Sequence, residues 1–219
     1  MHRSLFPFLC LLFCLLPASL SAQGHLLLVG GGSESQGGWS DAHYQWLVDQ
    51  APNHRVAIIS YRQETQWLPD YFMSLGATFA RNFYVTDPIS ASSQGLYDSL
   101  ATYDAIFFKG GDQAVYYDSY RNTLLEQAVE ETFAAGGVIG GTSAGMAILS
   151  EVLFSAENGS AYPEDVLADV DDPYLVLKNN FLHLNQGLFF DTHFVERGRL
   201  GRMAAFLARW YLDRGEVLL

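Results

Sequence analysis

The sequence contains very little cysteine. Its 219 residues include only Cys10 and Cys14, both near the N-terminus. The part of the chain that follows has no thiol, which excludes a disulfide scaffold, a cysteine nucleophile and a thiolate metal site there. Any chemistry in that part therefore depends on oxygen and nitrogen groups.

Basic residues are few as well. Lys and Arg together number 12 against 24 Asp and Glu, which makes the formal net charge −12. Nucleic-acid binding needs a basic face, so this balance argues against a nucleic-acid partner. The basic residues are unevenly spread, with a late cluster at Arg197, Arg199, Arg202 and Arg209. A local cationic group in an acidic protein suits the carboxylate of a substrate.

The N-terminal apolar run, residues 5–16, is shorter than the about 20 residues that a membrane span needs. It follows Arg3 and precedes a small-residue segment ending at Ala22, an order typical of a cleaved signal peptide. We therefore predict a signal peptide over residues 1–22, no stable membrane anchor, and an exported protein, periplasmic or extracellular. Residues 23–219 are then expected to form one domain.

Apolar runs alternate with helix-like segments along the chain. The runs predict strands at residues 25–29, 55–60, 79–85 and 105–108, and a further strand leading into Ser143. Helical spacing is found at residues 41–50, 65–75, 120–135 and 202–213. This order predicts an α/β fold with a mainly parallel sheet covered by helices on both faces.

In such a sheet, ligands bind at the carboxyl ends of the strands. That rule brings three loops to one cleft: the Gly30-Gly31-Gly32 run, the Gly111-Asp112-Gln113 run and the turn at Ser143. The glycine run lacks the lysine of a phosphate-binding loop, so we interpret it as a tight strand-to-helix turn. Residues 158–180, rich in Asp, Pro and Tyr, predict a loop or lid at the same edge.

Ser143 lies between Gly141 and Gly145, the G-x-S-x-G pattern of a nucleophile elbow. In that turn the hydroxyl is exposed, and the next amide, of Ala144, points to the same place. The alternative is a small-residue turn packed under a helix. A serine nucleophile also needs a base. His193 is the candidate, because residues 187–194 predict a short strand that presents Asp191 and His193 on the same side.

Three segments, residues 108–113, 140–145 and 191–202, resemble the motifs of cyanophycinase and its relatives among the S51 serine peptidases. The resemblance implies a flavodoxin-like, class I glutamine amidotransferase-like fold, with serine where the amidotransferases carry cysteine. It implies hydrolysis of β-aspartyl bonds in a peptide or polymer substrate. It requires neither metal nor organic cofactor, and because such relatives often pair, a homodimer is compatible with it.

The same resemblance implies residue roles. Ser143 corresponds to the nucleophile and His193 to the base, with Gly111 and Ala144 supplying oxyanion amides. The positions that line or shape the substrate pocket are Gln113, Asp191, Thr192, Arg197 and Arg199. Arg202 either belongs to this set or holds the loop through a carboxylate. For the acid of the triad we predict Glu157, because a strand end positions a carboxylate well; Glu164 is the competing candidate.

The chain departs from the family pattern in two ways. Thr192 stands where cyanophycinases carry glutamine, which puts cyanophycin itself in doubt as the substrate. Relatives also continue past the helix at residues 202–213, so we expect a C-terminal truncation. Two other functions remain open: an inactive homologue that binds acidic peptides in the same cleft, and an esterase of the α/β-hydrolase class, whose histidine normally lies close to the C-terminus.

Overall fold

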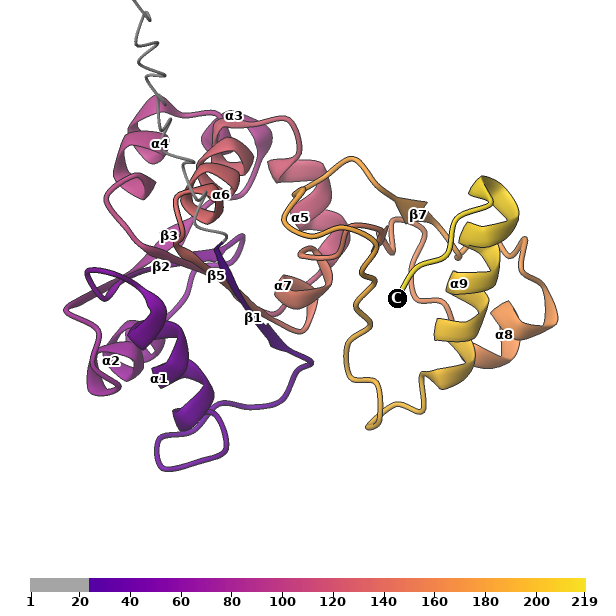
Figure 1. Ribbon diagram of the computed structural model, residues 1–219, viewed down its shortest axis with the longest axis horizontal. Coiled ribbons are helices and arrows are strands. Elements are labelled where there is room, and N and C mark those ends of the chain that lie inside the picture. Colours follow the sequence, from indigo (N-terminus) through magenta and orange to yellow (C-terminus); the bar gives the residue numbers. More distant parts are fainter. Residues whose placement is uncertain (1–23) are drawn as a thin grey trace, which may run out of the picture.

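The computed structural model describes residues 24–219. The predicted signal peptide, residues 1–22, lies outside them. At the centre is a five-stranded parallel sheet in the order β1-β5-β4-β2-β3. Its strands are β1 (His25–Val29), β2 (Arg55–Ser60), β3 (Phe79–Tyr84), β4 (Ala105–Phe108) and β5 (Val138–Thr142). The predicted α/β fold is confirmed (Figure 1).

Helices cover both faces of the sheet because neighbouring strand residues point in opposite directions. Val56 and Ile58 of β2 belong to the core cluster under α1 (Asp41–Gln50) and α2 (Trp67–Ser74). Ala57 and Ile59 belong to the cluster on the other face. That second face is covered by α3 (Pro88–Ala91), α4 (Gln94–Leu100), α5 (Gln113–Tyr120), α6 (Leu124–Ala134) and α7 (Ala144–Ala147).

Residues 149–219 form a smaller C-terminal part beside the sheet (Figure 1). Its elements are β6 (Leu153–Phe154), α8 (Pro163–Ala168), β7 (Leu177–Lys178) and α9 (Leu200–Arg214). A separate apolar cluster, which includes Phe154, Val166, Phe189, Phe206 and Trp210, packs these elements together. No helix within residues 24–219 combines the length and the apolar character that crossing a membrane requires.

Three segments differ from the sequence-based expectation. The helix predicted at residues 120–135 begins only at Leu124, because Asn122 has a positive φ of 58° and Thr123 caps the N-terminus of α6; Tyr120 is the last residue of α5. The segment at residues 158–180 was expected to be a loop, but it contains α8 and ends in β7, which pairs antiparallel with β6.

The strand predicted at residues 187–194 is absent from the described structure. Three backbone amides of this segment donate to separate distant acceptors instead of one neighbouring strand. The amide of Phe189 donates to the carbonyl of Leu219, and that of Phe190 to Ser150 Oγ. The amide of His193 donates to the carbonyl of Gly30. Apolar composition suggested a strand here, but these long-range partners produce an extended loop.

Candidate active site

Ser143 lies in a strained turn directly after β5. Its backbone has φ 52° and ψ −121°, and its amide donates to the carbonyl of Val29 at 2.9 Å. The flanking glycines leave no space for a side chain. A Cβ on Gly141 would lie 2.1 Å from the carbonyl oxygen of Gly145, and one on Gly145 would lie 2.2 Å from that of Phe108. Both glycines are therefore sterically required by the turn that exposes Ser143.

His193 meets Ser143 from the extended loop. The distance from Ser143 Oγ to His193 Nε2 is 2.9 Å. The backbone amide of His193 donates to the carbonyl of Gly30 at 2.7 Å, so the end of β1 binds both members of the pair. The imidazole also packs against Gly31, where a Cβ would lie 2.4 Å from His193 Cε1. Gly31 thus makes room for the histidine ring, a role that its interpretation as a turn residue did not include.

The carboxylate of Glu196 is hydrogen-bonded to the other ring nitrogen of His193. His193 Nδ1 lies 2.8 Å from Glu196 Oε2, and Glu196 is largely exposed. The hydrogen bond from His193, together with the charge of that ring, lowers the pKa of the Glu196 carboxyl. An ionised carboxylate can only accept, so Nδ1 is the donor, and in the neutral ring Nε2 is left to accept the Ser143 proton. The pair thus has the hydrogen-bonded orientation of a serine nucleophile and its base.

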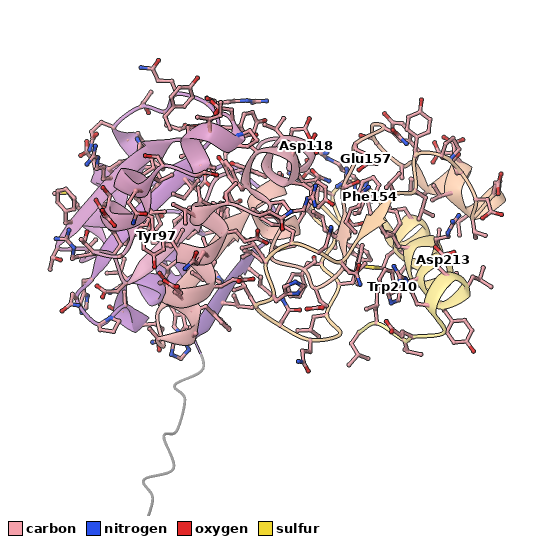
Figure 2. All side chains as sticks on the ribbon, turned by 90° about the horizontal axis from the view of Figure 1, so that it is seen from above. Tyr97, Asp118, Phe154, Glu157, Trp210 and Asp213 are labelled. Atoms are coloured by element: carbon pink, nitrogen blue, oxygen red, sulfur yellow. The ribbon has the colours of Figure 1, made fainter. Side chains whose placement is uncertain are left out.

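The structure does not place Glu157 where we predicted it. Its carboxylate lies 2.9 Å from Lys178 Nζ and accepts a hydrogen bond from Ser155 Oγ at 3.2 Å. Both of these partners lie beside β6. In Figure 2 Phe154 and Glu157 lie between the central sheet and α9. Glu164 lies in the first turn of α8. The carboxylate that the structure places beside His193 is therefore that of Glu196, from the same loop, and not that of the predicted Glu157.

A cavity of about 350 Å³ opens beside Ser143 and His193. Of the predicted site residues, Gly111, Gln113, Thr192, Arg197 and Arg199 line it. Its other lining residues are Arg62, Asp112, Phe154, Ala156, Gly159, Ser160 and Arg202. Four arginines against one carboxylate make this cavity cationic in a protein whose formal net charge is −12. An anionic substrate group would gain from such a wall.

Asp191 is not among the lining residues, although we predicted that it shares the cleft with His193. Its side chain forms an ion pair with Arg202, and the two side chains are only 4% and 3% exposed. Arg202 Nε donates to Asp191 Oδ2 at 2.8 Å, and its guanidinium also lies over the rings of Phe154 and Phe206. The expectation failed because the segment is not a strand, so its residues do not alternate between two faces. Arg202 holds the loop through a carboxylate, one of its two predicted roles.

Arg199 and Thr192 are bound to each other at the cavity wall. Arg199 Nη1 donates to the Thr192 carbonyl at 2.8 Å and to its Oγ1 at 3.3 Å. Burial, followed by the charge of Arg202, lowers the pKa of Arg199 to about 10, which leaves it protonated at neutral pH. Arg197 is exposed and has no ion-pair partner within residues 24–219. The two arginines predicted to bind substrate therefore differ: Arg199 is bound to Thr192, and Arg197 is exposed without such a partner in the described residues.

The two amides expected to bind an oxyanion belong to Gly111, which lines the cavity with Ser143, and to Ala144, which follows Ser143 in the chain. Gly111 packs against Tyr61, where a Cβ would lie 2.7 Å from the Tyr61 ring, and the preceding loop is held by the Tyr116 hydroxyl, which donates to the Lys109 carbonyl at 2.8 Å. Ala144 is the first residue of α7 and is buried. Within the described residues neither amide donates a hydrogen bond to another protein group. Both are thus available to an oxyanion.

Sequence reasoning missed three contributors to this site. Glu196 was quoted within the motif segment but given no role, although its spacing of three residues from His193 was a usable signal. Gly31 was treated as a turn residue, and Arg62 carried no motif at all. Within residues 24–219, no group of three or more His, Cys, Asp and Glu side chains is arranged to hold a metal ion.

The fold and the motifs agree with a known peptidase family. Residues 26–185, most of the chain, match the model of peptidase family S51. The chain belongs to peptidase family S51. The match includes Ser143 and ends before His193 and Glu196. The predicted family is confirmed.

Curated relatives of this S51 chain are cyanophycinases. It is 26% identical to the cyanophycinase of Synechococcus elongatus over 140 residues, which is 64% of this chain and 41% of that protein. It is 24% identical to the cyanophycinase of Geminocystis herdmanii over 189 residues, which is 84% of this chain and 66% of that protein. The chain thus spans less than half the length of the first relative and about two thirds of the second.

Two solved structures share the fold. A peptidase from an acI-B1 actinobacterium superposes with a TM-score of 0.60 at 18% identity, covering 84% of this chain and 77% of that one. A putative peptidase E protein from Listeria monocytogenes superposes with a TM-score of 0.52 at 15% identity, covering 84% and 88%. At these identities the likeness concerns the fold alone.

Proposed function

We propose that this S51 chain is a serine-type exopeptidase that hydrolyses β-aspartyl or related peptide bonds. The observation that carries the proposal is the 2.9 Å contact between Ser143 Oγ and His193 Nε2, with the opposite ring nitrogen bound by Glu196. Membership of a peptidase family supports the reaction type. The substrate, the residue roles and export from the cell are parts of the proposal.

The reaction follows from the positions of the groups. His193 Nε2 takes the proton of Ser143 while Oγ attacks the peptide carbonyl carbon, and the amides of Gly111 and Ala144 bind the oxyanion. His193 then gives the proton to the leaving amine, the C–N bond breaks, and an acyl-serine ester remains. Water, deprotonated by His193, hydrolyses this ester and regenerates the Ser143 hydroxyl. Glu196 keeps the ring in the required tautomer throughout.

The cationic cavity supports an acidic acyl group. An acyl residue attacked at its β-carbonyl carries a free α-carboxylate close to the reacting carbon, and Arg197 and Arg199 line the space beside Ser143. Thr192 replaces the glutamine of cyanophycinases, so isoaspartyl peptides are proposed as substrates alongside the β-aspartyl-arginine polymer. In the proposed setting the enzyme acts after export, outside the cytoplasm.

The test is hydrolysis of β-aspartyl dipeptides, α-aspartyl dipeptides and β-aspartyl-arginine polymer by the protein and by Ser143→Ala. Loss of the nucleophile is expected to lower kcat by about 10⁶-fold. Ser160→Ala is the matched control, because Ser160 lines the same cavity, while the serine hydrogen-bonded to His193 is Ser143.

Cleavage that survives in Ser143→Ala would contradict the proposed nucleophile. Turnover of small esters without any peptide cleavage would favour an esterase. A folded protein that binds acidic peptides and cleaves none would favour the binding-only alternative. Circular dichroism of each variant shows whether it is folded.

A further inference from the structure

Arg62 lies at the same edge of the sheet as Ser143, on the loop that follows β2. Its amide donates to Ser60 Oγ at 3.0 Å, and Ser60 Oγ donates to Glu64 Oε1 at 3.1 Å, so side chains at the strand end shape this loop. The Arg62 guanidinium lies over the Tyr61 ring at 5.0 Å. Tyr61 in turn packs edge-on against the buried Tyr116, at 5.1 Å between ring centres. Arg62 is thus an exposed cation resting on a packed aromatic wall.

Arg62 differs from most cations around it because no carboxylate holds it. Lys109 pairs with Glu64 at 3.0 Å, and Arg202 pairs with Asp191. Within residues 24–219, Arg62 has neither an ion pair nor a side-chain hydrogen bond to a carboxylate. Its charge is therefore available to a ligand.

Arg62 also borders two cavities that meet at Ser143 and His193. The first is the arginine-rich cavity described above, which includes Gly111. The second, of about 340 Å³, is lined by Gly32, Glu34, Arg62, Glu64, Lys109, Gly110, Thr142, Ser143 and His193. Ser143 and His193 therefore border a second cavity, and Gly111 is not among its lining residues.

The proposed reaction assigns the two cavities. The acyl part of the substrate extends into the first cavity, beside the oxyanion amide of Gly111. His193, which gives its proton to the leaving amine, lines both cavities, so we assign the leaving residue to the second cavity because the acyl part takes the first. Of the charged groups there, Glu64 is paired with Lys109, and Glu34 accepts from the buried Tyr44 hydroxyl at 2.9 Å. Arg62 is the cation left without a partner on that side.

We propose that Arg62 binds the carboxylate of the leaving residue and is a specificity-determining residue for exopeptidase action. This inference rests on the proposed function. The α-carboxylate of the leaving residue is two bonds from the scissile nitrogen, so a cation beside the Ser143–His193 pair is well placed to reach it. A planar guanidinium can bind that carboxylate through two parallel hydrogen bonds. A residue inside a longer chain has an amide there instead and gains no such contact.

The experiment compares a β-aspartyl dipeptide that has a free C-terminal carboxylate with the same dipeptide capped as the amide. For the unmodified protein, kcat/KM is expected to favour the free acid at least tenfold, the effect of a hydrogen bond between charged groups. In Arg62→Gln that ratio is expected to fall to about one, through a higher KM for the acid. Arg62→Lys is expected to retain part of the preference, because it keeps the charge without the planar fork.

Two further arginines serve as controls. Arg81→Gln removes an exposed arginine that also rests on an aromatic ring, 5.2 Å from Phe83, and lines neither cavity, so the acid-to-amide ratio should not change. Arg197→Gln removes a charge from the first cavity and should lower kcat/KM for acid and amide alike. Equal cleavage of acid and amide by the unmodified protein, or an equal loss on both in Arg62→Gln, overturns the assignment of Arg62 alone. Absence of cleavage of either substrate overturns the proposed function and this assignment with it.

Discussion

Ser143 and His193 lie 2.9 Å apart, yet two regions of different construction position them. Ser143 follows β5, which pairs with β1 on one side and β4 on the other, and its turn is packed against backbone atoms. His193 belongs to a segment without a helix or strand in the described structure. That segment is held by single hydrogen bonds to Gly30 and Ser150 and by the buried Asp191–Arg202 pair.

The difference predicts how each region responds to change. The turn at Ser143 is surrounded by backbone that cannot move without disturbing the sheet, so substitutions there should lower the stability of the whole fold. The loop that carries His193 can shift as a unit, so substitutions that touch only the ring should lower activity and leave the fold intact. The four predictions below test this contrast, from the largest expected effect to the smallest.

Asp191→Ala should have the largest effect, because it leaves the buried charge of Arg202 without a partner. Removal of one member of a buried ion pair costs about 3–5 kcal/mol in free energy of unfolding. Urea denaturation measures this change. Asp213→Ala is the control, since Asp213 is 47% exposed in its pair with Arg209, and such surface pairs contribute about 0–1 kcal/mol. Equal losses in the two variants would show that the loop does not depend on the buried pair.

Gly145→Ala should destabilise the sheet region. The new Cβ would lie 2.2 Å from the carbonyl oxygen of Phe108. A shift of the backbone at Gly145 or at Phe108 would cost free energy, because Phe108 lies in the sheet and Gly145 lies in α7, which packs against it. We expect a loss of about 3 kcal/mol, visible in thermal unfolding as a Tm lowered by about 6–12 °C. Gly95→Ala is the control, because a Cβ there meets only Ser93 Oγ at 3.8 Å and alanine suits a helix. A variant with unchanged Tm would refute the view that the nucleophile turn is rigid.

Gly31→Ala should lower activity, with an added cost in stability because Gly31 has a φ of 126°. A Cβ at this position would lie 2.4 Å from His193 Cε1, so the ring must move away from Ser143. Displacement of a reacting group by about 1 Å costs about 100-fold in rate, and kcat measures it. Gly76→Ala is the control, because Gly76 also has a positive φ, of 105°, while a Cβ there has open space. Matching activities in the two variants would mean that the contact between Gly31 and the ring has no catalytic importance.

Glu196→Gln should have the smallest effect, a loss of kcat of about 10- to 100-fold. Loss of a buried triad acid costs about 10⁴-fold, but Glu196 is 68% exposed and water can replace part of its effect. Glu157→Gln is the control and should keep the full rate, because the Glu157 carboxylate pairs with Lys178. If Glu157→Gln is the slower variant, the original assignment of the acid is restored.

The advantage of Glu196 over glutamine should also depend on pH in a defined direction. The pKa of Glu196 is lowered from its ordinary value of 4.5, so the carboxylate stays ionised at and somewhat below that pH. Protonation of Glu196 should therefore remove its advantage only below pH 4.5, as the pH drops through the lowered pKa. An effect of Glu196→Gln that is the same above and far below that pKa would contradict a role for the ionised carboxylate.

The sequence predicted the sheet region well and the loop that carries His193 poorly. The strands at residues 25–29, 55–60 and 105–108 and the helix at residues 41–50 have the predicted bounds. For the two inner strands the reason is that apolar runs buried on both faces leave little choice of structure. The break before α6 was missed because a positive φ at Asn122 leaves no periodic signal. The strand predicted at residues 187–194 was wrong because composition does not reveal which distant groups accept the backbone amides.

What the sequence determined by itself is the local part of the site. The glycines beside Ser143 and the alternation of apolar runs act over a few residues, so they specify the turn and the parallel sheet wherever the rest of the chain lies. The tertiary structure alone decided which carboxylate lies beside His193. It also decided that Asp191 forms an ion pair with Arg202 and that Arg62 lies in the same cavity as Ser143. These contacts depend on the relative positions of several chain segments, and local sequence patterns do not specify those positions.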